Sequence, residues 1–208
     1  DDQTNTGGTG LFLLTDTLLG SGTYGGVYFD KSSRNSNAWQ GSDAQTWCQD
    51  FCSSNFSTGE QSAVLATTKS DEAFTSTYSL PFAASENILN EDKVFFLSAQ
   101  EAENDEYGFT NDAARIADYG VSAGVWWLRS PSANYTNLAG VVYRNGYGSN
   151  YYVNYDYAVR PAFNLDLNSV LFTSAAVGGK SANGMDSGLT AIGNYAGNEW
   201  KLTLLDKS

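Results

Sequence analysis

The chain contains no histidine among its 208 residues. It therefore lacks the imidazole that activates serine or cysteine nucleophiles, and it lacks a common nitrogen ligand of metal ions. Acid–base chemistry would fall to pairs of carboxylates, and the acidic residues cluster in 71–73 and 101–106. We expect both clusters to lie on solvated faces. The sequence therefore predicts no catalytic residue, no metal site and no cofactor.

Basic residues and long apolar runs are also scarce. Eleven Lys and Arg stand against 23 Asp and Glu, which gives a net charge of −12. A protein that binds a nucleic-acid backbone or an anionic membrane needs clustered basic residues, so neither partner is expected. No apolar run approaches the roughly 18 residues of a membrane-spanning helix, so we expect no direct membrane insertion.

The chain begins at Asp1 with neither a methionine nor a signal-like segment, and we interpret it as a processed or trimmed form. Few lysines and abundant Asp, Asn, Ser and Thr suit an extracellular bacterial protein. We therefore expect a location at the bacterial cell surface, with the signal and the anchor outside this sequence.

Only two cysteines are present, Cys48 and Cys52, which excludes a disulfide framework. They lie in SDAQTWCQDFCSSNF, where apolar residues recur at helical spacing. Ser42 and Gln45 form a capping-box pattern at its start. We therefore expect a helix over 42–56 with both thiols on its buried side.

Gly20, Gly22 and Gly25 form a G-x-G-x-x-G pattern. In dinucleotide-binding proteins this pattern opens a helix whose N-terminus holds a pyrophosphate. Here the strand-like GVYFD follows, so we interpret the three glycines as part of a turn.

Further helices are expected from capping signals. Ser57 with Glu60 begins one that includes QSAVLATT, and Ser98 with Glu101 begins a short one over AQEAEN. NDAARIADYG forms another, with Gly120 as its C-cap.

After Gly120 the chain consists mostly of strand-like pieces and loops. The strand-like pieces of the whole chain are LFLLT, GVYFD, KVFFLS, WWLRS, AGVVY, YYV, AVRPAFNLD and the C-terminal GNEWKLTLLDKS. We therefore predict an α+β fold with helices in the N-terminal two thirds and a mostly antiparallel sheet with long loops. A single domain would span 1–208, with its core at about 10–180 and an extension or the start of a following segment at 181–208.

The stretch from Ser132 to Tyr157 has an unusual composition. It holds seven of the thirteen tyrosines and five asparagines, but no Lys, Glu, Gln, Met or Trp. At the chain's average composition, about three residues of those five types would be expected here. Tyrosine offers rigid contact area with a polar tip, and Asn, Ser and Gly offer adaptable hydrogen bonds, as in antibody loops. The composition therefore indicates an exposed binding surface.

Unusual strings flank this stretch: WWLRSP at 126–131 and AVRPAFNLDL at 158–167, with DKVFFLSAQEAEN further upstream. With them the chain resembles a family of surface-protein domains of gut bacteria, the variable proteins of diversity-generating retroelements. The resemblance runs from about LFLL to VLFTSAAVGGK. It implies the C-type lectin-like fold of the formylglycine-generating-enzyme superfamily.

In that family, adenines of a template copy are mutagenised, which turns AAC-type asparagine codons into NNC codons. Such codons encode Asn, Tyr, Ser, Asp, Arg and Gly among others, but never Lys, Glu, Gln, Met or Trp. These are the five types missing from 132–157. The resemblance therefore implies that about 132–157 is a hypervariable segment.

The resemblance assigns a scaffold role to the flanking strings. The residues expected in the core are Trp126, Trp127, Leu128, Val141, Val153, Val159, Ala162 and Phe163. Arg129 and Arg160 would hold loops through hydrogen bonds or ion pairs. Gly140, Gly146 and Gly148 would serve turns or close approaches of the backbone.

The ligand-binding side chains are expected among the polar and aromatic residues of the segment. They are Asn134, Tyr135, Asn137, Tyr143, Arg144, Asn145, Tyr147, Ser149, Asn150, Tyr151, Tyr152, Asn154, Tyr155 and Asp156. Strand alternation places Tyr151, Val153 and Tyr155 on one side, so the sequence leaves open which tyrosines face outward.

We therefore predict a non-enzymatic module that presents this surface to a protein or a surface glycan. Two alternatives remain open. One is an enzyme related to formylglycine-generating or sulfatase-modifying factors, although the catalytic cysteines of those enzymes lie in the C-terminal region of the fold and Cys48 and Cys52 do not. The other is a purely structural domain of a bacterial adhesin.

Overall fold

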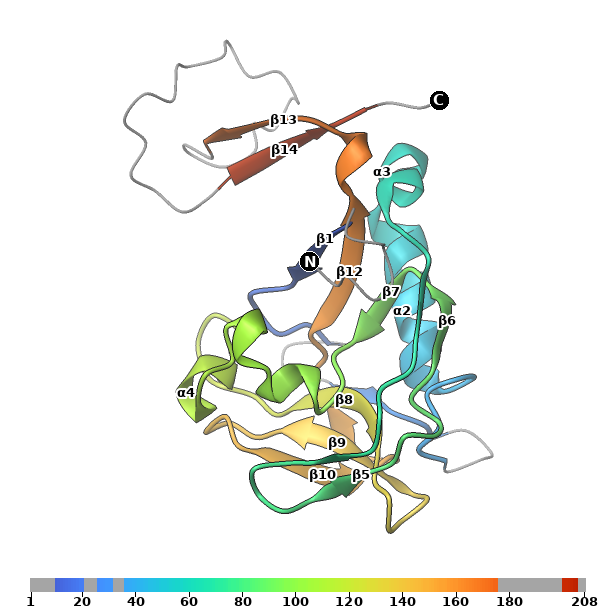
Figure 1. Cartoon of the computed structure of the whole chain (residues 1–208), viewed down its shortest axis with the longest axis vertical. Coiled ribbons are helices and arrows are strands. Elements are labelled where there is room, and N and C mark those ends of the chain that lie inside the picture. The colour runs from blue at the N-terminus through green and yellow to red at the C-terminus, as the bar shows by residue number, and fades with distance from the viewer. Residues whose placement is uncertain (1–9, 21–25, 32–35, 176–199, 206–208) are drawn as a thin grey trace.

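The structure is a computed structural model that describes residues 10–20, 26–31, 36–175 and 200–205. Two three-stranded antiparallel sheets form its body. Figure 1 shows one sheet at the centre, beside helix α2, and the other at the lower end, with the β13–β14 pair standing out at the upper end.

The central sheet has the strand order β1-β12-β7. Strand β1 (Gly10–Leu14) pairs with β12 (Pro161–Asp166), which pairs on its other side with β7 (Val94–Phe96). All residues of β7 are buried because α2 packs against this strand. The sheet therefore ties the beginning of the described chain to its middle and to the VRPAFNL string.

Helix α2 (Asp43–Asn55) confirms the first expected helix. Its N-cap is Ser42, whose hydroxyl accepts a hydrogen bond from the Gln45 amide at 3.0 Å. The Gln45 side chain donates to the buried carboxylate of Asp92 at 2.7 Å. The helix thus begins where expected, and its first turn is tied to the neighbouring strand.

The second sheet has the order β10-β9-β8. Strand β8 (Trp126–Pro131) is buried throughout, and β9 (Leu138–Val142) is buried except at Leu138. Strand β10 (Gly148–Tyr152) lies at the edge and is partly exposed after Gly148. Burial therefore falls from the WWLRSP string outward to the tyrosine-rich strand.

The remaining strands form four two-stranded antiparallel sheets. They pair β2 (Val27–Tyr28) with β11 (Asp156–Tyr157), β3 (Thr67–Lys69) with β6 (Leu89–Asp92), β4 (Phe74–Thr75) with β5 (Pro81–Phe82), and β13 (Val170–Ala175) with β14 (Trp200–Leu204). The other helices are α3 (Thr58–Ala63), α4 (Asp112–Arg115) and the 3-10 helices η1 (Glu101–Glu103), η2 (Asp105–Tyr107) and η3 (Leu167–Ser169).

The core lies between α2 and the two larger sheets. Its largest fully buried rings meet edge to face, with Trp39 and Phe96 at 5.3 Å and Phe29 and Trp127 at 5.6 Å between centroids. Seven of the eight expected core residues are buried: Trp126, Trp127, Leu128, Val141, Val153, Val159 and Ala162. Phe163 is only partly buried. It packs against Phe56, and both rings lie at the margin of the core.

Arg129 holds a buried ionic network together. Its guanidinium donates to Glu101 Oε2 at 2.5 Å, to the Phe96 carbonyl at 2.8 Å and to the Asp71 carboxylate. Lys69 lies 2.5 Å from Glu101 Oε1. Burial favours the neutral carboxylic acid, but the two cations outweigh it and lower the pKa of Glu101 to about 2.

This network corrects one expectation and confirms another. Asp71 and Glu101 were expected on solvated faces, but both are buried, because Arg129 supplies a charged partner inside the protein. The expectation that Arg129 forms ion pairs is confirmed. Arg160 holds a loop as expected, since its Nε donates to the Thr15 carbonyl at 2.8 Å.

The expected α+β class with a C-type lectin-like fold is wrong. The described chain consists mostly of small antiparallel sheets with few short helices, instead of helices followed by one larger sheet. Helix α3 ends at Ala63 because Val64 bridges to Leu165 and the following residues pair as β3 with β6. Tertiary pairing therefore overrides the helix signals.

The other expected helices are also shorter. The Ser98–Glu101 capping contacts form, but only the single turn of η1 follows. Helix α4 ends at Arg115. Gly120 lies in the turn between Asp118 and Ala123, which form an isolated antiparallel β-bridge. Its φ of +84° therefore serves this turn and not a helix C-cap.

The glycine pattern near the N-terminus is followed by a strand. Gly22 and Gly25 lie outside the described residues, and the chain after them forms β2. The described residues 26–31 therefore contain a strand where a dinucleotide-binding pattern would open a helix.

Candidate functional site

The fourteen candidate side chains line one continuous stretch of surface. The β9–β10 turn carries Tyr143, Arg144, Asn145 and Tyr147, and strand β10 carries Ser149, Asn150, Tyr151 and Tyr152. The chain after β10 carries Asn154, Tyr155 and Asp156, and the β8–β9 loop carries Asn134, Tyr135 and Asn137. The last group adjoins the others, since the amide of Val153 donates to the Asn137 carbonyl at 3.1 Å.

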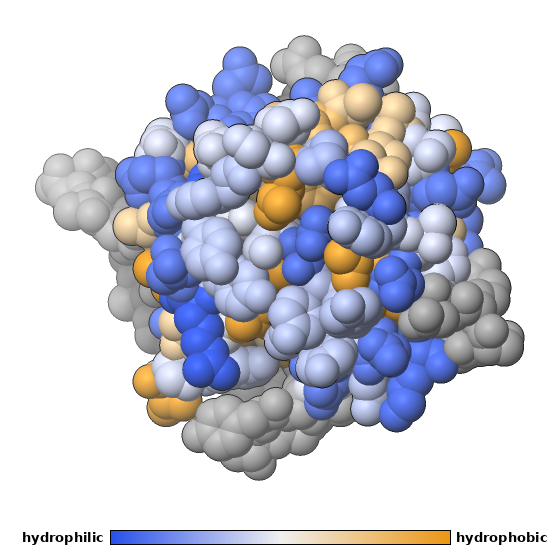
Figure 2. Space-filling model, turned by 90° about the horizontal axis from the view of Figure 1, so that it is seen from below, coloured by the Kyte–Doolittle hydropathy of each residue, from blue (hydrophilic) through white to orange (hydrophobic). Residues whose placement is uncertain are grey.

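None of the fourteen side chains is buried. Eight are exposed and six are partly exposed, and the most exposed tyrosines are Tyr135, Tyr152 and Tyr155, at 60%, 50% and 48%. Figure 2 looks onto the lower end of the molecule, where β9 and β10 lie, and shows weakly hydrophilic side chains mixed with strongly hydrophilic ones and small hydrophobic spots. Their role in binding stays a prediction.

Seven tyrosine rings lie along this surface in two groups of contacting rings, and we call the seven together the tyrosine face. They are Tyr78, Tyr143, Tyr147, Tyr151, Tyr152, Tyr155 and Tyr157. At one end Tyr147 stacks on Tyr143 at 4.9 Å. At the other end Tyr151 meets Tyr155 edge to face at 4.8 Å. Burial raises the pKa of Tyr143, and the phenols of Tyr147 in its own group and of Tyr151 in the other group raise it further.

The tyrosine face rests on the hydrophobic core. Tyr157 lies between the buried Trp127, at 5.2 Å, and Tyr151, at 5.3 Å. Burial raises the pKa of Tyr157 well above its ordinary value. Strand alternation places Tyr151, Val153 and Tyr155 on one side. Of these three, Val153 is buried, Tyr151 is partly exposed and Tyr155 is exposed. Rings that touch the core thus support rings that touch water.

Asn37 holds the β8–β9 loop. Its buried side-chain amide donates to three main-chain oxygens, those of Tyr135 at 2.9 Å, Leu138 at 2.9 Å and Ser132 at 3.3 Å. An amide that serves three carbonyls fixes the course of the loop without touching its side chains.

Arg115 holds the β9–β10 turn in the same way. Its guanidinium is buried, donates through Nε to the Gly146 carbonyl at 2.7 Å and pairs with Asp112. Gly146 has a φ of +86°, and a Cβ there would lie 1.7 Å from the Asp112 carbonyl oxygen. The turn therefore requires glycine both for its conformation and for its approach to α4.

Two other glycines of the segment also lie at close approaches, as expected. A Cβ on Gly140 would lie 3.2 Å from Leu128 and Phe82, and one on Gly148 would lie 3.0 Å from Glu103 Oε1. Only Gly146 of the three has a positive φ.

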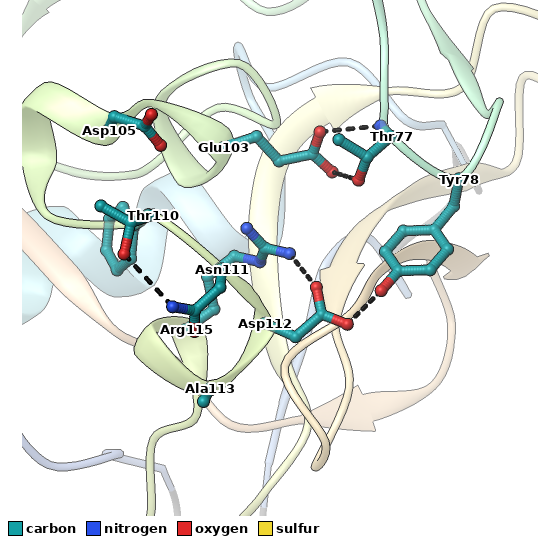
Figure 3. A pocket seen from close by; sticks show the side chains of 10 residues that line it. Thr77, Tyr78, Glu103, Asp105, Thr110, Asn111, Asp112, Ala113 and Arg115 are labelled. Carbon is teal, nitrogen blue, oxygen red and sulfur yellow. Dashed lines mark hydrogen bonds and ion pairs between the residues drawn. The ribbon is translucent and has the colours of Figure 1, made fainter.

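A pocket of about 570 Å³ opens beside the turn, between α4, η2 and the β4–β5 connection. Figure 3 shows the Tyr78 hydroxyl and the Arg115 guanidinium converging on the Asp112 carboxylate at one side, with Glu103 opposite. Glu103 accepts hydrogen bonds from the amide of Thr77 at 2.8 Å and from its hydroxyl at 3.3 Å. The ring of Tyr78 lies 5.0 Å from that of Tyr147, so the pocket adjoins the tyrosine face.

Sequence reasoning missed Asn37, Tyr78 and Arg115. Each acts on the segment from a distant part of the chain, and no local pattern marks them. The one available signal was the glycine at 146, which indicated a close approach without identifying the neighbour. Tyr157 lay within the segment but was not among the candidates, and it forms the base of the tyrosine face.

The described residues supply no obvious site for a metal, and the thiols are buried. No group of three or more His, Cys, Asp or Glu side chains in this part of the chain could hold an ion. Burial raises the pKa of both Cys48 and Cys52, which keeps them protonated near neutral pH. As far as the chain is described, none of its helices has the length and apolar character to cross a bilayer.

The fold and the site define a small β-rich domain with an exposed tyrosine face. Residues 9–167 match the family described as "Domain of unknown function (DUF6273)". The match covers more than half of the chain, so the chain belongs to this family. Neither a curated protein nor a solved structure matches the chain.

Proposed function

We propose that this domain is a non-enzymatic binding module in which residues 132–157 present a tyrosine- and asparagine-rich surface to a protein or a surface glycan. One observation carries the proposal. Asn37 and Arg115 hold the main chain of the segment, while all fourteen candidate side chains keep access to solvent. Because these contacts end on main-chain oxygens, exchange of the fourteen side chains leaves them in place.

The chemistry of the surface suits recognition. Tyrosines on a fixed base lose little conformational entropy when they bind, and their hydroxyls satisfy polar groups of a ligand. Tyr152 and Tyr155 provide the exposed rings, and Asn150 and Asn154 beside them offer both donors and acceptors. Binding energy would therefore concentrate in a few rings, as in protein interfaces.

The proposal includes diversification of this segment by a retroelement and display outside the bacterial cell. The absence of the five residue types that NNC codons cannot encode supports diversification. A reverse transcriptase gene and a template copy of the codons for 126–165 in the neighbouring DNA would support it directly. Related genomic copies with substitutions spread evenly along the chain would contradict it.

A library experiment tests the binding function. The fourteen codons are replaced by NNC codons, the domains are displayed on yeast, and the library is selected against an unrelated soluble protein and against an immobilised glycan. We expect most members to stay folded and some to bind, because the holding contacts do not involve the exchanged side chains.

A matched library provides the control. It places NNC codons at the fourteen exposed positions of residues 46–75 that remain when the α3 capping-box residues Ser57 and Glu60 are kept, and none of these positions belongs to the tyrosine face. The proposal fails if the segment library unfolds more often than this control library, or if the two libraries yield binders equally often.

A further inference from the structure

We propose that the pocket beside Tyr78 is the fixed part of the binding surface and takes a lysine or arginine side chain of a protein partner. This inference rests on the proposed function and narrows it, because it selects a cationic protein over a glycan. The argument uses the pocket's shape, its aromatic wall and its charge.

The aromatic wall of the pocket includes Tyr78, which lies outside 132–157, and Tyr147 of the variable segment adjoins it. Tyr78 comes from the β4–β5 connection and is 42% exposed, and its ring lies 5.0 Å from Tyr147 at a tilt of 58°. Its hydroxyl donates to the Asp112 carboxylate, which also pairs with the buried Arg115. The ring is therefore held in place before a ligand arrives, which is how tyrosines contribute most to binding.

The charge of the pocket favours a cation. Its lining includes three carboxylates, those of Glu103, Asp105 and Asp112, against the single guanidinium of Arg115. Asp112 compensates that guanidinium, so two negative charges remain within a pocket whose chain carries −12. An ammonium or guanidinium placed here would meet a carboxylate and the face of a phenol ring together.

A phenol ring already contacts a cation elsewhere on the molecule: Lys31 Nζ lies over the ring of Tyr28, 4.0 Å from its centroid. The pocket's volume of about 570 Å³ leaves room for a long side chain to enter from the partner. A neutral sugar would gain the ring contact but would leave the excess negative charge without a partner.

Nuclear magnetic resonance titration of the whole chain tests the inference. The probes are the capped tripeptides Gly-Lys-Gly and Gly-Arg-Gly, the Nε-acetyl-lysine form of the first, and N-acetylglucosamine. We expect the lysine and arginine peptides to shift the ring resonances of Tyr78 and Tyr147 with a Kd in the range of about 1–20 mM. We expect acetylation to weaken binding by about fivefold or more, since it removes the charge.

Two neighbouring substitutions provide a matched pair. Asp105→Asn removes a pocket carboxylate and should weaken lysine binding by about threefold or more, whereas Glu106→Gln changes an exposed carboxylate outside the pocket and should have no effect. Both residues belong to η2 and both are exposed, so neither change should affect folding.

The outcomes separate the inference from the proposed function. Equal binding of the acetylated peptide, preference for N-acetylglucosamine, or no shift with any probe overturns the cationic pocket alone. The library selection does not depend on charge at Asp105. Failure of that selection overturns the binding function, and with it this inference.

Discussion

The Gly146 carbonyl oxygen accepts a hydrogen bond from Arg115 Nε over 2.7 Å, and Arg115 pairs at the same time with Asp112. One side chain of α4 thus holds the tip of the β9–β10 turn, 31 residues away in sequence. The turn carries Tyr143 and Tyr147, so the position of two of the seven rings of the tyrosine face depends on a contact made outside it.

Gly146→Ala should destabilise the domain more than a positive φ alone explains. The substitution costs about 1–2 kcal/mol for the left-handed conformation, and a Cβ would also lie 1.7 Å from the Asp112 carbonyl oxygen. Moving the turn off α4 should add about 1–3 kcal/mol. Urea unfolding measures the sum. Gly120→Ala is the control, since Gly120 has a φ of +84° and nothing within 4 Å of a Cβ; equal losses for the two variants would contradict the contact.

Tyr155→Ala and Tyr157→Ala should have different effects. Tyr155 is about half exposed and does not pack on the buried core, so its loss should cost less than about 1 kcal/mol of stability while it weakens ligand binding. Tyr157 packs on the buried Trp127 at 5.2 Å, so its loss should cost about 2 kcal/mol. Chemical denaturation compares them, and Tyr157→Phe, which keeps the ring, should recover most of that loss. If Tyr155→Ala unfolds the domain, its ring belongs to the core and the assigned surface is wrong.

The thiols should be slow to react in the native protein. Burial raises the pKa of Cys48, to which the nearby charge of Asp92 adds, and burial also raises the pKa of Cys52. Because the thiolate is the reactive form, Ellman's reagent should modify the native chain about tenfold or more slowly than the unfolded chain. Cys48→Ala and Cys52→Ala variants would report each thiol separately. Rapid reaction of either thiol in the folded protein would instead favour the enzymatic alternative.

The sequence predicts well what depends on local spacing. The helical recurrence around Cys48 located α2 to within a residue at each end, and the apolar strings located the buried strands β7 and β8. The composition of 132–157 indicated exposed side chains, and the fourteen candidates are at least partly exposed. In each case the signal comes from neighbouring residues that share one environment.

What the sequence could not show depends on contacts between distant segments. Glu101 is buried because Arg129 lies 28 residues further along the chain, and Asp71 meets the same guanidinium from 58 residues away. The helix signal after Ser57 was outweighed by the pairing of β3 with β6. The fold class was wrong for the same reason: strand pairing between short segments leaves little trace in local periodicity.

Acid should destabilise the domain through Glu101. Its folded pKa is about 2 against an ordinary value of 4.5, so the unfolded chain takes up a proton at higher pH than the folded chain. The stabilisation is therefore complete above about pH 4.5 and is lost as the pH falls through about 2, with a size on the order of 3 kcal/mol. Denaturation midpoints measured between pH 7 and pH 2 should fall steeply below pH 4.5.

Glu101→Gln provides the decisive comparison. At pH 7 it should cost about 3–5 kcal/mol, because it leaves the buried Arg129 and Lys69 with less compensating charge, and it should flatten the loss of stability below pH 4.5. Glu106→Gln, which changes an exposed carboxylate, should keep the acid profile of the unsubstituted chain. Carbon-13 resonances of the Glu101 carboxyl report its titration directly, without unfolding. A midpoint near 4.5 in the folded protein would show that Arg129 does not hold this carboxylate in its charged form.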